Sequence, residues 1–361
     1  MAPKTFSSFL KPPKYLEMPA VGIEITDTVV RFAELKNHLG QNQLGRFGEI
    51  ILPAGTVEKG HILKPEELLK VLRKIREENN FHFVKSSLPE EESYLFKLAI
   101  PRGLNLCEEI RQNIEFRLEE NVPLSVAESV FDYFLIEKSN GEQEASVSVV
   151  PLAIVETYTD LLTRAGFQVI SYDVESKAVA KSVVRRGDQA PYLVINIKDR
   201  STTIMIIENG VVQYTTTASI GGYDITEAIK RNMALTFDEA KKRKEQLLFV
   251  ESKDSIELFN ILINFVSAIK DETEKFYSFW RSRSLENGRS GQEIKKAYLC
   301  GKDSALVGFE KYLTIGLKME VELCAVWQNI FSPDYFLPSI KFLDSLNYAV
   351  PVGLFLKGND Q

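Results

Sequence analysis

The stretch VINIKDRSTTIMIIENGVVQYTTTASIGGYDIT (194–226) decides the fold of this 361-residue chain. Short runs rich in Val, Ile and Thr, separated by turn residues, predict three successive strands, at 192–197, 202–208 and 211–217. Asn209-Gly210 favours a tight hairpin turn between the last two. Gly221-Gly222 then precedes a predicted helix. The fold therefore contains a three-strand meander that leads through a glycine turn into a helix.

The chain opens with the same order of elements. Three apolar runs predict strands at 21–26, 29–35 and 45–52. A helix follows from Pro65, which suits a first helical turn, and its Leu and Ile side chains recur at helical spacing. The two halves share too little sequence to prove a duplication, but their order of elements predicts a duplicated α/β core.

Between the two halves, residues 94–174 follow another order, β-α-β-β-α-β, which is typical of a ferredoxin-like unit. Asn140-Gly141 favours a hairpin between the two middle strands. The expected elements are strand 94–100, helix 106–120, strands 130–137 and 145–153, helix 156–165 and strand 168–173. The helix expected at 176–184 returns to the pattern of elements seen before residue 94, so this unit is interpreted as an insertion.

The rest of the second half is predicted to be largely helical. A helical stretch runs over 237–280, and Thr236 with Glu239 has the spacing of a capping box at its start. The polar segment 282–292 is expected to be a surface loop, and 298–301 a strand that meets a turn. The apolar segment 346–356 ends the fold as a strand or a helix.

Composition excludes several functional classes. The chain is 44% hydrophobic and 26% charged, which is typical of a soluble globular protein. Its formal net charge of −6 argues against binding nucleic acid. Three cysteines and three histidines without ligand spacing argue against a disulfide framework or a zinc site. No apolar run reaches the roughly 18 residues that span a bilayer, and no secretory signal precedes the first strand, so we expect a cytoplasmic protein.

Three segments resemble the signatures of actin-like ATPases, in the expected order. They are 21–35 for the first phosphate turn, 194–226 for the second, and YLCGKDSALVGFEKYL (298–313) for the adenosine turn. The insertion resembles the extra subdomain of FtsA and of the PilM family of type IV pilus assembly proteins. Further segments resemble PilM in particular, namely 109–124, 161–176, 237–247 and 347–358.

This resemblance implies an α/β fold of the actin-like, two-lobed class, a duplicated ribonuclease H-like core with an inserted ferredoxin-like subdomain. It also implies a division of the chain. We expect an N-terminal tail at 1–18, lobe 1 at 19–93, the inserted subdomain at 94–174, a return helix to lobe 1 at 175–190, lobe 2 at 191–345 and a C-terminal return to lobe 1 at 346–361.

The resemblance places a nucleotide cleft between the lobes, where glycine turns let backbone N–H groups approach phosphate oxygens. The positions that it assigns to nucleotide binding are Thr26, Thr28, Asn196, Lys198, Thr202, Gly221, Gly222, Lys244 and Gly301.

Several of these positions depart from the family pattern. Thr26 replaces a glycine, and a charged Asp27 beside phosphate would cost a few kcal/mol, roughly, without a cation between them. Asn196 replaces the Asp that holds magnesium, so the charge is lost while the shape is kept. Lys198 replaces a glycine and could offset phosphate charge, and Lys241 stands where a Glu is usual. These departures argue against hydrolysis and leave binding of ATP and magnesium open, and no catalytic residue or metal ligand is assigned.

The PilM resemblance implies a cytoplasmic scaffold that is peripheral at the inner membrane. Its expected partner is the N-terminal cytoplasmic segment of a PilN-like protein, bound between 20–93 and 94–174, with other pilus platform or motor components and a homo-oligomer left open. The machine could serve pili or a related type II secretion system. Two alternatives remain at this point: an active, nucleotide-switched ATPase on the same fold, and an FtsA-like filament protein of cell division.

Overall fold

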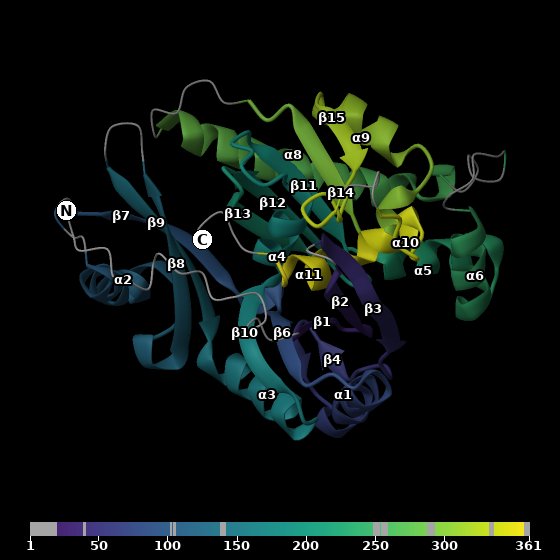
Figure 1. The fold of residues 1–361 in the computed structure, drawn as a ribbon. Helices are drawn as coiled ribbons and strands as arrows, with labels where there is room; N and C mark the ends of the chain where they lie inside the picture. The colour runs from purple at the N-terminus through teal and green to yellow at the C-terminus, as the bar shows by residue number, and fades with distance from the viewer. Residues whose placement is uncertain are drawn as a thin grey trace.

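The structure is a computed structural model, and it describes residues 20–38, 41–101, 103, 106–137, 142–247, 253, 259–286, 293–331 and 336–356. The predicted tail at 1–18 and the predicted Asn140-Gly141 turn lie outside these residues. Two five-stranded sheets dominate the fold, one in each lobe, and a three-stranded sheet lies beside them (Figure 1).

The first lobe is built on a sheet with the strand order β10-β6-β1-β2-β3. The first three strands along the chain form an antiparallel meander, and β6 and β10 join it in parallel. The strands are β1 (Ala20–Ile25), β2 (Val29–His38), β3 (Gln41–Ile51), β6 (Phe83–Leu88) and β10 (Gln168–Val174). A small hairpin of β4 (Val57–Glu58) and β5 (His61–Ile62) follows the meander.

The second lobe repeats this topology strand for strand, in the order β13-β12-β11-β14-β15. Again a meander of three antiparallel strands is extended by two parallel ones. The strands are β11 (Tyr192–Ile197), β12 (Thr202–Glu208), β13 (Val211–Ala218), β14 (Lys296–Cys300) and β15 (Glu320–Leu323). The predicted duplication of the core is thus present in the pairing of the strands.

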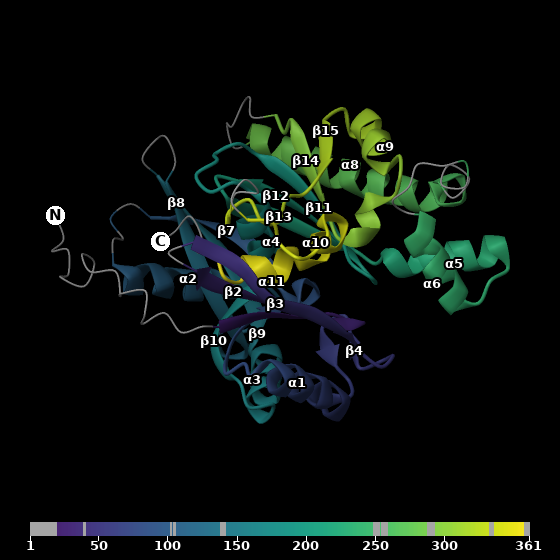
Figure 2. The same ribbon diagram turned by 45° about the vertical axis from the view of Figure 1, so that its right-hand side comes forward.

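Helices cover both faces of each sheet, which explains why β11 and β12 are apolar without alternation. In lobe 1, α1 (Pro65–Asn79) and α3 (Leu152–Arg164) pack on the outer face through buried side chains such as Leu72 and Leu161. Between the lobes, α4 (Glu175–Val183) packs against α11 (Ala349–Gly353). Both views show these two helices between the sheets (Figures 1 and 2).

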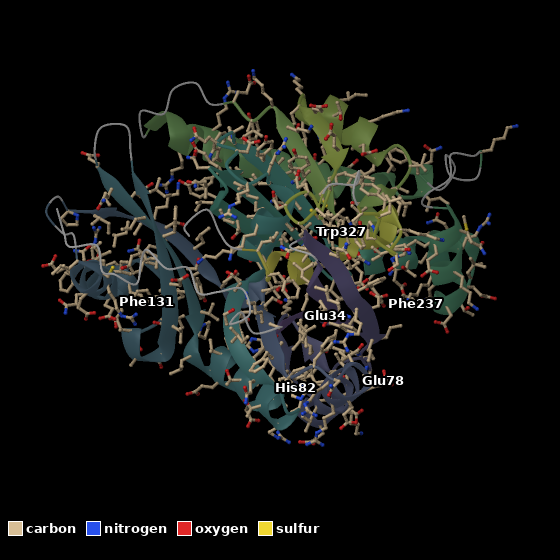
Figure 3. All side chains as sticks on the ribbon, in the orientation of Figure 1. Glu34, Glu78, His82, Phe131, Phe237 and Trp327 are labelled. Atoms are coloured by element: carbon tan, nitrogen blue, oxygen red, sulfur yellow. The ribbon has the colours of Figure 1, made fainter. Side chains whose placement is uncertain are left out.

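Lobe 2 carries its other helices on the outer face and at one end of the molecule. The helices are α5 (Gly222–Met233), α6 (Phe237–Leu247), α8 (Ile263–Glu286) and α9 (Phe309–Leu317), followed by the short α10 (Phe342–Ser345). Ile225, Ile269 and Phe309 bury their side chains on the sheet. Phe237 marks the end formed by α5 and α6, and Phe131 marks the opposite end (Figure 3).

The inserted region forms its own sheet with the order β7-β9-β8. The strands β7 (Tyr94–Ile100), β8 (Ser129–Glu137) and β9 (Gln143–Pro151) pack with α2 (Cys107–Asn121) around a separate apolar cluster. The order of elements is the one expected for a ferredoxin-like unit, but the pairing differs. β10 pairs with β6 in lobe 1, and α3 packs into the lobe 1 core, because their apolar faces are buried there.

One detail of the second half differs from the sequence prediction, and the structure decides another that was left open. α8 continues to Glu286, so the first part of the loop expected at 282–292 is helical, and 287–292 lies outside the described residues. The segment for which strand and helix were both left open is helical, with short helices η6 (Leu346–Tyr348) and α11. None of the described helices combines the length and the hydrophobicity needed to cross a bilayer.

Candidate functional site

A cavity of about 1740 Å³ opens between the two lobes. Its wall includes both meander turns, the start of α5 and the end of β14. Six of the nine predicted nucleotide-binding positions line it: Thr28, Asn196, Lys198, Gly222, Lys244 and Gly301. The tertiary structure therefore brings together residues that lie up to 273 positions apart, from Thr28 to Gly301.

Thr26, Thr202 and Gly221 lie outside the cavity wall, in structural roles. The Thr26 hydroxyl donates to the carbonyl of Val29 at 2.9 Å and accepts the N–H of that residue at 3.1 Å, which closes the β1–β2 turn. The Thr202 hydroxyl donates to the carbonyl of Ile220 at 2.7 Å. These side chains shape the turns on which the cleft is built.

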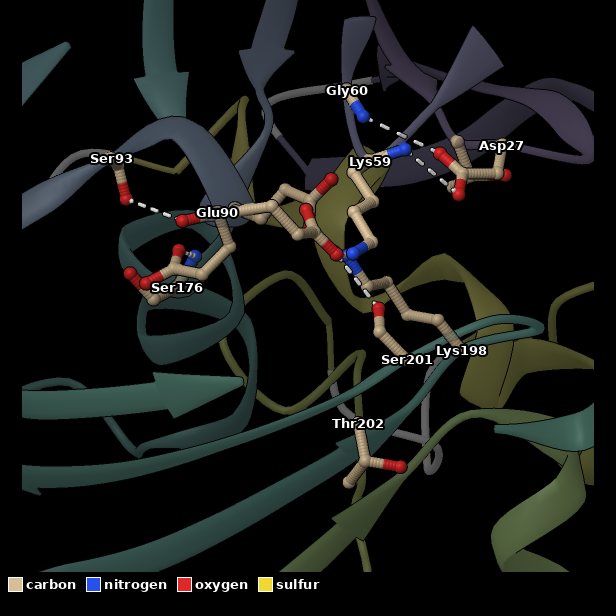
Figure 4. A network of polar contacts seen from close by, with 12 residues as sticks. Asp27, Lys59, Gly60, Glu90, Ser93, Ser176, Lys198, Ser201 and Thr202 are labelled. Carbon is tan, nitrogen blue, oxygen red and sulfur yellow. Dashed lines mark hydrogen bonds and ion pairs between the residues drawn. The ribbon is translucent and has the colours of Figure 1, made fainter. Parts of the chain in front are cut away.

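The β1–β2 turn holds its charged side chain, Asp27, against the β4–β5 hairpin. The Asp27 carboxylate accepts the backbone N–H groups of Lys59 and Gly60 at 3.1 and 3.4 Å, as Figure 4 shows. The neighbouring Thr28 hydroxyl donates across the lobes to the Asp199 carboxylate. The first turn is thus tied to the β4–β5 hairpin and to lobe 2.

The β11–β12 turn places the Lys198 ammonium between two carboxyl groups of the first lobe. Its Nζ lies 2.9 Å from Glu91 and 2.7 Å from Glu175, and the side chain is 9% exposed. Burial alone would lower the pKa of Lys198, but the charges of Glu175 and Glu91 outweigh it and raise that pKa. Figure 4 shows Lys198 and Ser201 reaching this cluster from the same turn.

One ammonium can balance the charge of only one carboxylate, so the pKa values of Glu91 and Glu175 shift in opposite directions. Burial raises the pKa of Glu91, but the Lys198 charge and hydrogen bonds outweigh it, and the net pKa is lowered. Burial raises the pKa of Glu175 to about 8 despite Lys198. One ammonium thus faces two carboxyl groups, and the pKa is lowered for Glu91 and raised for the fully buried Glu175.

The helix end that faces the cleft has its first N–H groups in use. Gly222 and Tyr223 donate to the backbone carbonyls of Lys198 and Asp199 at 2.9 and 2.8 Å, and Asp224 donates to Gly221 at 3.0 Å. The Gly221 N–H donates in turn to the Asp224 side chain at 2.8 Å. An anion at a helix N-terminus needs such donors free, so this end of α5 does not fit a phosphate group in the arrangement described.

A carboxylate of the protein itself lies at this helix end. Lys244 Nζ contacts the two Asp303 oxygens at 2.9 and 3.0 Å and donates to the carbonyl of Gly222 at 3.1 Å. A Cβ added at Gly222 would collide with the Asp303 carboxylate. The three protons of the ammonium therefore already have acceptors, on one carboxylate and one carbonyl.

Asn196 and Gly301 form the floor of the cleft, where β11 and β14 end side by side. Asn196 is 6% exposed and pairs in register with Thr203 and Cys300. Gly301 has φ +84°, and a Cβ there would collide with the carbonyl of Ile197, so this close approach needs glycine. A neutral amide at this position supplies no charge for a magnesium ion.

Several residues of the site were missed by the sequence reasoning. Arg31 is buried and lies 3.6 Å from Glu24 and 3.7 Å from Asp199, which links the lobes a second time. Glu91 and Glu175 are 84 positions apart, and no spacing rule connects them. The available signal was the charge of Lys198 and Asp303 at turn positions where the family has small residues, since buried charges require partners.

Two sheets of identical topology with a cleft between their meander turns define an actin-like protein. A family model described as "Type IV pilus assembly protein PilM" matches residues 22–359. The chain therefore belongs to the PilM family.

Several solved structures are similar to this chain over most of its length. A structure titled "PilM-PilN type IV pilus biogenesis complex" matches with a TM-score of 0.74 at 20% identity, over 93% of this chain and 97% of the other. The ethanolamine utilization protein EutJ from Carboxydothermus hydrogenoformans matches with a TM-score of 0.54 at 15% identity, over 97% and 91%. MreB5 of Spiroplasma citri bound to ADP matches with a TM-score of 0.55 at 12% identity, over 93% of this chain and 95% of the other. At these identities the likeness shows the actin-like fold.

Proposed function

We propose that the protein is a non-hydrolysing, actin-like scaffold of a type IV pilus or related type II secretion platform. In this proposal it is cytoplasmic and peripheral at the inner membrane, where it binds the N-terminal cytoplasmic segment of a PilN-like protein. The PilM family match supports this reading over an FtsA-like filament protein. We further propose the chain division given above. Within its inserted segment 94–174, residues 94–151 form the separate sheet with α2, while α3 and β10 pack with lobe 1. Homo-oligomers and other platform components remain predictions.

One observation carries the pseudo-ATPase part: charged groups at the cleft turns have partners within the protein. Lys198 is paired with Glu91, and Lys244 with Asp303. The α5 N–H groups bond to backbone carbonyls and to Asp224. A nucleotide would have to break these contacts, and the Asn196 amide would not restore a metal-binding charge.

Titration calorimetry with ATP, with and without magnesium, tests this part. We expect no binding heat from the parent protein and no phosphate release above background. Asp303→Gly should free Lys244 and give a nucleotide-binding heat that the parent protein lacks, since a buried ammonium then has no carboxylate partner. Asp344→Gly is the matched control, because Asp344 pairs with Lys302 at 2.7 Å on the same cavity wall.

Micromolar, magnesium-dependent binding by the parent would contradict the proposal and favour the nucleotide-switched alternative. Asn196→Asp separates two causes in the same assay. Gain of magnesium-dependent binding in this variant would place the loss at the β11–β12 turn. No heat in either protein would leave scaffolding as the whole function.

The partner part is supported by two sheet edges at the boundary of the inserted region. β8 is an edge strand of the small sheet and β10 an edge strand of lobe 1. Val130 on β8 and Ile170 on β10 are 42% and 38% exposed. Edge strands with exposed apolar side chains can accept an extended peptide by strand addition. Asp132, two residues further along β8, pairs with Lys177 of α4 at 3.3 Å, so this face of β8 lies beside α4.

A fluorescent peptide with the N-terminal cytoplasmic sequence of the PilN-like partner tests this part. Val130→Glu should weaken binding at least tenfold by placing a charge on the proposed surface. Phe116→Glu is the control, because Phe116 is an 84% exposed apolar residue on the outer side of α2. Deletion of 94–174 would also remove β10 and α3 from the lobe 1 core, so the substitution is the sharper test. An equal loss of peptide binding in Val130→Glu and Phe116→Glu would reject the placement of the peptide at these sheet edges.

A further inference from the structure

The Lys198 cluster joins three parts of the fold at one point. Lys198 belongs to the β11–β12 turn of lobe 2. Glu91 belongs to the short helix η3 (Glu90–Glu92), which leads from β6 directly into β7 of the inserted sheet. Glu175 begins α4 directly after β10. Because β6 and β10 are parallel neighbours, with Leu88 opposite Val174, both carboxyl groups project from the same edge of the lobe 1 sheet.

The helix η3 has further ties to the same two neighbours. The Ser201 hydroxyl of the β11–β12 turn donates to Glu91 at 2.8 Å. The buried Glu90 carboxylate accepts the backbone N–H of Ser176, in α4, at 3.0 Å. A displacement of the β11–β12 turn would therefore pull on η3 and, through it, on the first residues of β7.

The inserted sheet also rests on lobe 2 at a second place. Lys97 of β7 donates to Gln213 of β13, and Ser146 of β9 donates to the Val212 carbonyl at 3.5 Å. By contrast, the Lys177–Asp132 pair joins α4 to β8 on the surface, where Asp132 is 84% exposed. The buried polar contacts of the inserted sheet thus run through η3, β7 and β9.

We infer that Lys198, Glu91 and Glu175 form a clamp that fixes the β11–β12 turn of the cleft to the start of the inserted sheet. The clamp holds the two lobes together with protein groups alone, at the place where a charged ligand would otherwise bridge them. It also makes the position of η3 and β7 depend on the position of the cleft turn. This inference goes beyond the proposed function and does not require that a nucleotide or a peptide binds.

Hydrogen exchange of the full chain, followed by mass spectrometry, tests the clamp. Lys198→Met removes the ammonium and keeps much of the side-chain volume. We expect amide exchange in residues 89–100 to accelerate at least tenfold, while β12 (Thr202–Glu208), buried along its whole length, keeps its protection. Lys177→Met removes the surface pair and should leave 89–100 unchanged.

Glu91→Gln is the second variant, because Lys198→Met leaves two buried carboxyl groups without their cation and could unfold the protein. It keeps the shape of the side chain and should accelerate exchange in 89–100 in the same direction, by a smaller factor. Unchanged exchange in 89–100 with Glu91→Gln would overturn the clamp. A uniform rise over all segments, β12 included, would overturn it as well, because a purely structural pair destabilises the whole fold. Neither result would bear on ATP or peptide binding, which are measured separately.

Discussion

At the scale of single residues, the site is a set of charges that neutralise one another. Lys198 replaces an expected glycine and contacts the carboxyl groups of Glu91 and Glu175. Asp303 forms an ion pair with Lys244. Each of these charges is buried or nearly so, and a buried charge without a partner costs several kcal/mol, roughly. The replacements at the turns were therefore possible only together with their partners elsewhere in the chain.

The carboxyl of Glu175 predicts a pH dependence of stability. Burial raises its pKa from the ordinary 4.5 to about 8. A carboxyl group whose folded-state pKa lies above its unfolded value stabilises the fold fully below about pH 4.5 and loses that contribution as the pH rises towards 8. Burial also raises the pKa values of Glu24 and Glu90. We therefore expect the free energy of unfolding to fall between pH 5 and pH 8, by on the order of a few kcal/mol.

Urea unfolding at a series of pH values measures this slope. Glu175→Gln keeps a neutral hydrogen-bonding group and should make the slope shallower, with Glu24 and Glu90 providing what remains. Glu34→Gln is the comparison, because Glu34 lies outside this cluster, its contacts with Arg46 outweigh burial and lower its pKa, and its contribution changes only in more acidic solution. Stability that rises from pH 5 to pH 8, or an unchanged slope in Glu175→Gln, would contradict the raised pKa of Glu175.

At the scale of elements, the start of α5 shows how a helix end is adapted to its surroundings. Gly222 is the first residue of the helix, and its missing side chain leaves room for the Asp303 carboxylate of the β14 turn. The strand order also positions the cleft, since β11 and β14 are neighbours and end at the same edge. The Gly-Gly turn therefore serves close packing between elements in this protein.

Gly222→Ala tests this packing. Although Ala favours helices over Gly by about 1 kcal/mol, its Cβ would displace Asp303 from Lys244, so we expect a net loss of about 1–3 kcal/mol in the free energy of unfolding. The double variant Gly222→Ala with Asp303→Gly should lose less than the sum of the single variants, by about 1 kcal/mol or more. Additive losses in chemical denaturation would show that the two groups do not compete for one space.

At the scale of the whole molecule, the two lobes are held together without a ligand. Lys198 with Glu91, and Arg31 with Asp199, are interlobe contacts at the turns. The apolar cluster between the sheets adds α4 and α11 to these contacts. Contacts within the protein therefore hold the two lobes in one arrangement, which fits the scaffold role proposed above.

The sequence by itself determined the elements and their order. The alternation of apolar runs with turn residues at 192–217 gave strands within a residue or two of those observed, because such runs depend on local propensity and burial. The repeated order of elements predicted the duplicated core, and the three turn signatures located the cleft. Six of the nine positions named in advance line the cleft.

Only the tertiary structure decided how the charges are paired and where two elements belong. Glu91 gave no local signal of its role, and the charge of Asp303 at its turn did not identify Lys244 as the partner, since an ion pair between residues far apart in the chain depends on the packing of whole lobes. β10 and α3 follow the expected order of a ferredoxin-like unit, yet they complete the lobe 1 sheet and its core. A strand pairs with the edge against which its apolar face is best buried, and no local pattern specifies which edge that is.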